Sequence, residues 1–237
     1  MDDGRDAATY TIAVMGNISV SHLYAFMRMY RLYFDNREFI FAGLASTVLL
    51  CIGIVSNTFA NVYATEQASN SVTDIVLSNM SVVDVDGVFV WGTFVLTVFV
   101  LVLALVKPQF LPFTFASLGL FYLIRTVFVS LTHLGPFPDH TVLDVGALIA
   151  KMIGGGDMFF SGHTGAPFLL ALIFWKQRML RYVFLVWSIF FAAVVLLGHL
   201  HYSIDVLSAF FITYTIFCIS EFLFRKYRTL FYEGVQN

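Results

Sequence analysis

The sequence predicts an all-α, polytopic membrane protein with a bundle of six transmembrane helices, and three observations lead to this fold class. Of the 237 residues, 59% are hydrophobic and only 12% are charged, and the mean hydropathy is +0.84. Soluble domains carry roughly 25% charged residues, so a water-soluble fold could not bury this much apolar surface. Because a membrane-spanning helix needs about 20 mostly apolar residues, we expect six spans, at 39–60, 88–106, 110–131, 162–176, 182–198 and 202–224.

The Lys and Arg residues orient these predicted spans. Eleven of the 13 flank the spans on one face, whereas the opposite face holds only Lys151 and the third span contains Arg125. By the positive-inside rule, both termini are predicted to be cytoplasmic, and the other face periplasmic, lumenal or extracellular. A bacterial inner membrane and a Golgi or plasma membrane share this topology, so both locations stay open.

The predicted spans divide the chain into three parts. Residues 1–37 form a cytoplasmic N-terminal segment, residues 38–226 form the six-helix transmembrane domain with the candidate catalytic residues, and residues 227–237 form a cytoplasmic tail. Residues 23–34 mix aromatic side chains with two arginines. This pattern predicts either a helix lying on the inner leaflet or a helical extension of the first span.

His201 and Asp205 lie four residues apart at the outer end of the sixth predicted span. On a helix, this spacing places both side chains on one face. A carboxylate bonded to one imidazole nitrogen fixes the tautomer and makes the other nitrogen a better nucleophile or base. The alternative for Asp205 is a structural carboxylate that caps the helix or reaches water, because an unpaired charge in a span is costly.

The fourth predicted span begins at Ser161-Gly162-His163-Thr164. A helix N-terminus holds anions through its free N–H groups and its dipole. Ser161 is expected to cap the helix, and Gly162 lets a phosphate approach the backbone. Two histidines and a carboxylate would then meet at one mouth of the bundle, which predicts transfer of a phosphoryl group.

Residues 156–164 (GDMFFSGHT) and 201–206 (HYSIDV) together resemble the signature pair of the sphingomyelin synthase family, a branch of the type 2 phosphatidic acid phosphatase superfamily. The similarity covers about 125–210 and includes Arg125-Thr126 and the turn at 135–138. The Lys and Arg-Pro motif of the phosphatase branch is missing, and the outer segment 61–87 lacks the prolines of the synthases.

The resemblance implies a two-step exchange. His201, oriented by Asp205, would attack the phospholipid phosphorus and become a phosphohistidine, while His163 would serve as acid and then as base. A phosphocholine or phosphoethanolamine-like headgroup would pass from a glycerophospholipid to ceramide or another lipid alcohol, with no cofactor and no metal. The remaining substrate-binding residues are expected to be Asp157, Ser161, Gly162, Arg125 and Tyr202.

Charge on the outer face bears on the substrate independently of this resemblance. That face is predicted to hold Lys151 as its cation, together with Arg125, against seven acids: Glu66, Asp74, Asp84, Asp86, Asp139, Asp144 and Asp157. Phosphate monoesters carry about two negative charges and are held by Lys and Arg clusters. An acidic face therefore favours a zwitterionic phosphodiester lipid, and Tyr63, Trp91 and Tyr202 are candidates for cation–π contact with its ammonium group.

Several alternatives stay open. The same scaffold supports a phospholipase C-like hydrolase or a lipid phosphate phosphatase, and intramembrane charges also occur in lipid transporters. Arg125 is expected to face the phosphate or Asp157, or to form a structural ion pair. His199 forms a His-x-His pair with His201, so a zinc site with His163 and Asp205 is a further alternative.

Expected partners are the phospholipid donor, ceramide or diacylglycerol-type lipids and the bilayer, with no nucleic acid. The oligomeric state stays open. His133 and His140 either line the site or are solvated loop residues.

Overall fold

The computed structural model describes residues 24, 26–28, 30–141 and 159–235, and its regular secondary structure within them is entirely helical. Five helices are long and apolar enough to cross a membrane, and a sixth, shorter apolar helix accompanies them. The predicted all-α membrane fold is confirmed. The long helices are α2 (Arg37–Glu66), α3 (Asp86–Val106), α4 (Leu111–Leu131), α7 (Arg178–Leu197) and α8 (Ser203–Leu223), and the short one is α6 (Gly162–Ile173).

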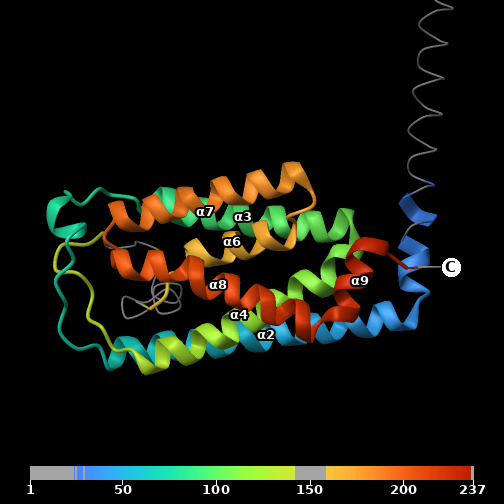
Figure 1. The fold of residues 1–237 in the computed structure, drawn as a ribbon, viewed down its shortest axis with the longest axis horizontal. Helices are drawn as coiled ribbons and strands as arrows, with labels where there is room; N and C mark the ends of the chain where they lie inside the picture. Colours follow the sequence, from blue (N-terminus) through green and yellow to red (C-terminus); the bar gives the residue numbers. More distant parts are fainter. Residues whose placement is uncertain (1–23, 25, 29, 142–158, 236–237) are drawn as a thin grey trace, which may run out of the picture.

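The helices run alternately up and down along one long axis (Figure 1). At one end of the bundle, which we call the loop end, lie the described connections 67–85, 132–141 and 198–202. Helices α6 and α8 both begin at this end, as does α3. The starts of α6 and α8 carry the two histidine motifs of the sequence, so the topology places both motifs at the same end of the bundle.

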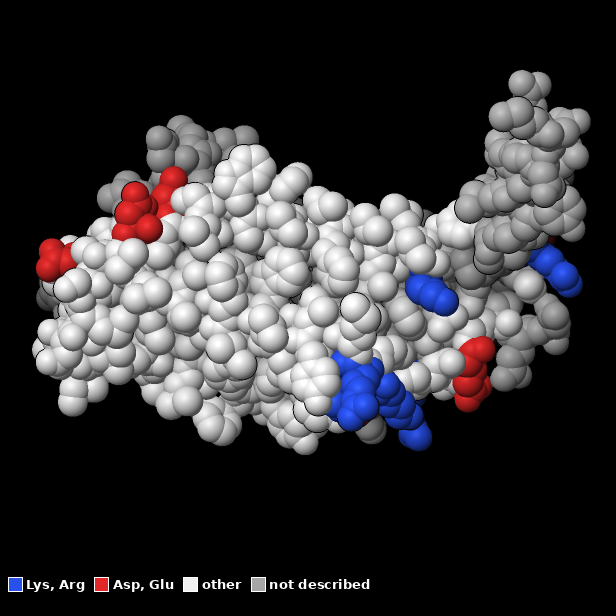
Figure 2. Space-filling model, turned by 90° about the horizontal axis from the view of Figure 1, so that it is seen from above, with Lys and Arg blue, Asp and Glu red and all other residues white. Residues whose placement is uncertain are grey.

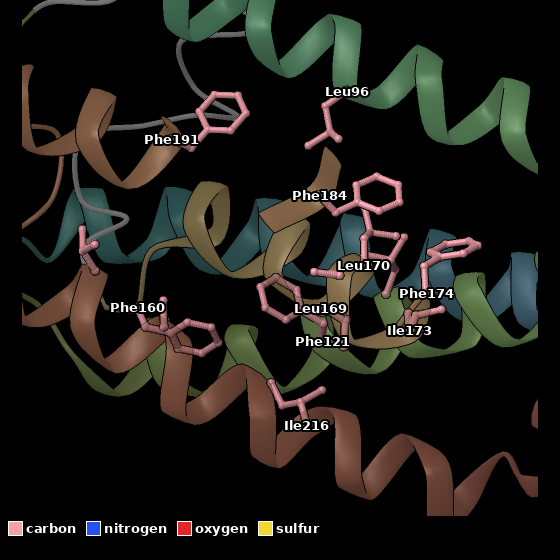
Figure 3. Packing of buried hydrophobic residues seen from close by; sticks show 14 of the residues in the cluster. Leu96, Phe121, Phe160, Leu169, Leu170, Ile173, Phe174, Phe184, Phe191 and Ile216 are labelled. Carbon is pink, nitrogen blue, oxygen red and sulfur yellow. The ribbon is translucent and has the colours of Figure 1, made fainter. Parts of the chain in front are cut away.

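Helix α6 is shorter than predicted and lies inside the bundle. Its 12 residues extend about 18 Å, against roughly 30 Å for a bilayer core. The helix stops at Ile173 because the chain turns at Phe174–Gln177 before α7 begins. Its residues Leu169–Ile173 are buried, surrounded by Phe121 of α4, Phe184 of α7 and Ile216 of α8 (Figure 3).

Helices α2 and α4 pack with their backbones in contact. A Cβ on Gly53 would lie 2.6 Å from the carbonyl oxygen of Gly119, and a Cβ on Gly119 would lie 2.8 Å from the backbone of Leu49. Small residues allow transmembrane helices this close approach. The α2–α4 pair is therefore a tightly joined unit, and it supplies one side of the site described below.

The end opposite the loop end contains two further helical segments. Residues 30–34 are helical, but a turn at Asp35 separates them from α2, whose first turn is capped by Asn36 through its Oδ1 and the Phe39 N–H (2.9 Å). The segment is therefore no simple extension of the first span, and its location on the inner leaflet stays a prediction. Helix α9 (Arg225–Glu233), which the sequence did not predict, follows α8.

Lys and Arg are unevenly distributed along the bundle. On the face in Figure 2, Lys and Arg lie only in the half that contains α9, whereas Asp and Glu lie both there and at the loop end. This distribution agrees with the pattern in the sequence. The assignment of the loop end to the non-cytoplasmic side stays a prediction.

Candidate active site

His201 and Asp205 are close together, but the helix does not bring them together in the predicted way. Helix α8 begins only at Ser203, so His201 precedes it. The helix starts there because the Asp205 carboxylate accepts the N–H of Tyr202 at 2.9 Å and so caps the first turn. The same Oδ2 atom lies 3.7 Å from His201 Nδ1, and both side chains are almost fully buried. Asp205 therefore serves as a cap and as the neighbour of an imidazole.

The start of α6 is bound directly to the start of α8. The backbone N–H of Ser161 donates to the carbonyl oxygen of Asp205 at 3.1 Å. The Ser161 hydroxyl accepts the N–H of Thr164 at 3.4 Å, which confirms the predicted cap. Two motifs about 40 residues apart in the sequence therefore share a hydrogen bond, and the register between them is fixed.

His163 lies on the first turn of α6 and is half-buried. Its imidazole packs against the ring of Phe89 in α3, with centroids 4.2 Å apart, and against that of Phe191 in α7 at 5.8 Å. It also lies within electrostatic range of His201 and of the Arg125 guanidinium. The two imidazoles thus come from different segments, the first turn of α6 and the residues just before α8.

Arg125 is 98% buried in α4 and is bonded on two sides. Its Nε donates to the carbonyl oxygen of Phe160 at 2.9 Å, and its Nη1 donates to Asn57 Oδ1 in α2 at 3.0 Å. A Cβ on Gly162 would lie only 3.0 Å from Arg125 Nε, so the glycine lets the guanidinium reach the start of α6. The sequence predicted that a substrate phosphate approaches Gly162. In the structure, the group that lies against Gly162 is the Arg125 guanidinium.

Asn57 was not predicted from the sequence. It lies in the middle of an apolar span, where a single buried amide is a weak signal unless its partner is known. The structure shows that this partner is Arg125. Arg125 also donates a hydrogen bond to the carbonyl oxygen of Phe160, the residue that precedes the Ser161 cap. Helix α2 therefore contributes to the position of His163 without reaching it.

Tyr202 is only 1% exposed, and its hydroxyl is bonded within the protein. The hydroxyl donates to the carbonyl oxygen of Gly135 at 2.8 Å and accepts the N–H of Val72 at 3.2 Å. This environment favours a structural role over the predicted contact with a lipid headgroup, because the ring is packed beneath Leu77 and Phe137.

Asp74 is a second residue whose role was not predicted, because its place in a polar loop indicates only an acid of the outer face. The structure buries it and bonds it to the N–H groups of Ser203 (2.7 Å), Val76 (2.8 Å) and Leu77 (3.1 Å). Burial acts to raise the pKa of the Asp74 carboxyl, but these hydrogen bonds outweigh it and hold that pKa below its usual value.

The other histidines have partners of their own. His199 is buried with a positive φ of 51°, and its Nδ1 lies 2.7 Å from the carbonyl oxygen of Asp139. His133 and His140 each lie beside a backbone oxygen three residues earlier in the chain. Within the described ranges, no three His, Cys, Asp or Glu side chains are grouped so that they could hold a metal ion.

Asp157, a predicted substrate-binding residue, lies outside the described residues. Of the predicted site residues, the described structure brings together His201 with Asp205, Ser161 with Asp205, and Gly162 with Arg125. Fold and site together define a multi-pass membrane protein with a histidine–carboxylate cluster where two buried helix starts meet.

Comparison with known proteins agrees with this class. Residues 154–222 match the family model described as PAP2 superfamily C-terminal. The match covers less than a third of the chain and includes α6, α7, His163, His201 and Asp205. It supports the type 2 phosphatidic acid phosphatase superfamily and an activity of the lipid phosphatase or phosphotransferase type. Searches of curated proteins and of solved structures gave no match.

Proposed function

We propose that this protein is a lipid phosphotransferase that moves a zwitterionic headgroup from a glycerophospholipid to a lipid alcohol such as ceramide, through a phosphohistidine. The observation that carries the proposal is the hydrogen bond from Ser161 N–H to the Asp205 carbonyl, because it holds the His163 and His201 motifs against each other. The superfamily match over 154–222 supports chemistry at phosphorus.

In the first step, His201 acts as the nucleophile. With Asp205 near Nδ1, the proton of the neutral imidazole is held at Nδ1, and Nε2 carries the lone pair that attacks phosphorus. A P–N bond forms, and the bond from phosphorus to the diacylglycerol oxygen breaks. His163 acts as the general acid for the departing oxygen, so diacylglycerol leaves as a neutral alcohol.

In the second step, the neutral His163 removes a proton from the acceptor hydroxyl. The acceptor oxygen attacks phosphorus, the P–N bond breaks, and its electron pair returns to His201 Nε2. Both histidines are restored, and no oxidant or external proton is consumed. The guanidinium of Arg125, fixed beside Gly162, supplies positive charge where the anionic transition state would form.

The charges among the described residues favour a phosphodiester substrate. At the loop end, Glu66, Asp84 and Asp139 are exposed, whereas Arg125 is buried and already donates to Phe160 and Asn57. A phosphate monoester brings about two negative charges and would meet acids before it meets this one guanidinium. A phosphocholine or phosphoethanolamine diester carries an ammonium group that the same acids attract.

The depth of the site supports reaction on a lipid that stays in the bilayer. Arg125 lies six residues before the end of α4, which places it about 9 Å inside the helix end. The start of α6 lies at the same level, because Gly162 contacts the guanidinium. A donor and an acceptor that approach sideways from the outer leaflet would bring their polar groups to this level without leaving the membrane.

Replacement of His201 by Ala tests the mechanism. His201→Ala should lower headgroup release by about a thousandfold or more, because the nucleophile is lost. His140→Ala is the matched control, since His140 is an exposed histidine at the same end of the bundle. Purified variants with equal thermal stability would be incubated with choline-labelled phosphatidylcholine. Activity retained in His201→Ala would remove this mechanism.

Water competes with a lipid hydroxyl for the same phosphohistidine, so a hydrolase is the second candidate. The assay is run with and without ceramide. Labelled sphingomyelin identifies a transferase, and free phosphocholine that is insensitive to ceramide identifies a phospholipase C-like enzyme. Phosphate released from phosphatidic acid alone identifies a lipid phosphatase, and lipid flux with no exchange in any lipid class identifies a transporter.

A further inference from the structure

The loop between α2 and α3 contains a segment that holds the start of α8, and we call residues 69–77 the strap. Asp74 lies within the strap and is only 7% exposed. Its Oδ2 accepts the backbone N–H of Ser203, the first residue of α8, at 2.7 Å. Its Oδ1 accepts the N–H groups of Val76 and Leu77, where a short helix begins. One carboxylate thus satisfies free amides of two helix starts.

A second contact joins the strap to the neighbouring residue, Tyr202. The Val72 N–H donates to the Tyr202 hydroxyl, which in turn donates to the Gly135 carbonyl oxygen. The strap also lies directly against Gly135, because a Cβ at Gly135 would overlap the carbonyl oxygen of Ser69. Residues 202 and 203 are therefore held through a backbone N–H and a side chain, immediately after His201.

We propose that Asp74 is a positioning residue for His201, acting through the first turn of α8. The first N–H groups of a helix have no acceptor one turn earlier in the same helix, so acceptors from outside that turn must satisfy them. At the start of α8, the Asp205 carboxylate accepts the N–H of Tyr202 and the Asp74 carboxylate accepts that of Ser203. Because Asp74 takes the Ser203 N–H, Asp205 needs to accept only that of Tyr202 and stays directed at His201 Nδ1. Without Asp74, the Asp205 carboxylate is drawn toward the Ser203 amide and away from the imidazole.

The inference rests on the proposed function, since it assigns Asp74 a part in placing the nucleophile. It also gives the outer loop a role that its composition does not suggest. The strap is separated from Ser203 by about 130 residues of sequence, and the Asp74 carboxylate joins the two segments through its hydrogen bond with the Ser203 N–H.

Two variants remove the same contact from opposite sides. Asp74→Asn leaves one acceptor oxygen in place of two, so the N–H groups of Ser203, Val76 and Leu77 can no longer all be accepted. Ser203→Pro removes the N–H donor, and the proline is compatible with the fold because Ser203 is the first helical residue. Tyr202 has φ −68° and ψ 156°, the conformation that a residue before proline prefers. Asn79→Ala is the control, because Asn79 is an exposed residue close to the strap whose Nδ2 donates to the carbonyl oxygen of Ile75.

Each single variant should lower kcat about tenfold, which corresponds to about 1.4 kcal/mol of transition-state stabilisation. The KM should stay within about a factor of two of the parent value, because the contacts with substrate are intact. The double variant should be no slower than the slower single variant, because both changes delete one interaction. Asp74→Glu, which keeps a carboxylate, should restore part of the loss. Asn79→Ala should match the parent protein.

Two measurements do not depend on turnover. Hydrogen exchange at the amides of 202–206 should become faster in Asp74→Asn, and the pH profile for carbethoxylation of His201 by diethyl pyrocarbonate should shift. If the parent protein acts on no phospholipid, the proposed function fails, and these two measurements still decide whether Asp74 positions His201. If Asp74→Asn does not fold, Ser203→Pro provides the same test.

Three results would overturn the inference. The first is an Asp74→Asn protein in which exchange at 202–206 and the reactivity of His201 are unchanged. The second is a double variant whose loss of kcat equals the sum of the single losses in free energy. The third is a loss confined to KM, which would indicate that the strap contacts the substrate and does not position the nucleophile.

Discussion

Replacement of Gly162 by Ala tests the contact between Arg125 and the start of α6. The added Cβ would lie 3.0 Å from Arg125 Nε and 3.2 Å from Cζ, whereas ordinary contact begins at 3.4 Å. One of the two groups must therefore move by about 0.4 Å. The guanidinium is held by Phe160 and Asn57, so the start of α6, with His163 on it, is the group that gives way.

The magnitude follows from opposing effects. Overpacking a buried contact costs about 1–3 kcal/mol, while replacing a helical glycine by alanine gains up to about 1 kcal/mol. The free energy of unfolding should therefore fall by about 0–2 kcal/mol, and the protein should remain folded. Catalytic groups must be held within about 0.5 Å, so a shift of this size should lower kcat by about tenfold.

Gly87→Ala is the matched control, because Gly87 lies in the first turn of α3 at the same end and a Cβ there meets nothing within 4 Å. Headgroup release and thermal unfolding would be measured for both variants in the same detergent. Equal activity of Gly162→Ala and the parent protein would refute the reasoning, because the Arg125 contact would then have no control over His163. A fall in kcat in both variants would indicate a general effect of adding a methyl group at a helix start.

Two further predictions concern Asn57 and Asp74. Asn57→Leu should lower the free energy of unfolding by about 1–3 kcal/mol by removing an acceptor of a buried guanidinium, and it should also reduce kcat. Thermal unfolding and the headgroup assay measure these two effects, with the half-buried neighbour Thr58, changed to Val, as the control. The lowered pKa of Asp74 means that its contribution to stability is complete above the unfolded value of 3.8 and is lost as pH falls through the lower folded value. The gap in melting temperature between Asp74→Asn and the parent should thus be constant from about pH 7 to 5 and shrink below about pH 4; a gap that widens in acid would contradict this assignment.

Much of the fold could be predicted from the sequence because long apolar segments have few alternatives to a transmembrane helix. The predicted spans 88–106 and 110–131 differ from α3 and α4 by at most two residues at either end. The span predicted at 162–176 was too long, since apolar composition continues through the turn after Ile173. Helix α9 was missed because it is short and basic, and a cytoplasmic tail of the same composition is equally consistent with the sequence.

The site was predictable only in part. The spacing of His201 and Asp205 indicated their proximity, although a capped turn and not a helix face produces it. The roles of Asn57 and Asp74 depend on partners that are 68 and 129 residues away, Arg125 and Ser203, and no local pattern encodes such a separation. An acid in a polar loop looks solvated in the sequence whether or not it is buried.

The tight pairing of α2 with α4 has a consequence for the membrane around the protein. These two helices supply the guanidinium and its amide anchor, whereas the imidazoles of His163 and His201 belong to the start of α6 and to the residues just before α8. The guanidinium and the two imidazoles therefore come from separate segments of the bundle. Bilayer thickness biases the tilt of spanning helices, so we expect a thinner or thicker host membrane to shift α4 relative to α6 and α8 and to alter the alignment of Arg125 with the proposed nucleophile. Turnover in vesicles should accordingly peak at one acyl-chain length and fall on either side of it.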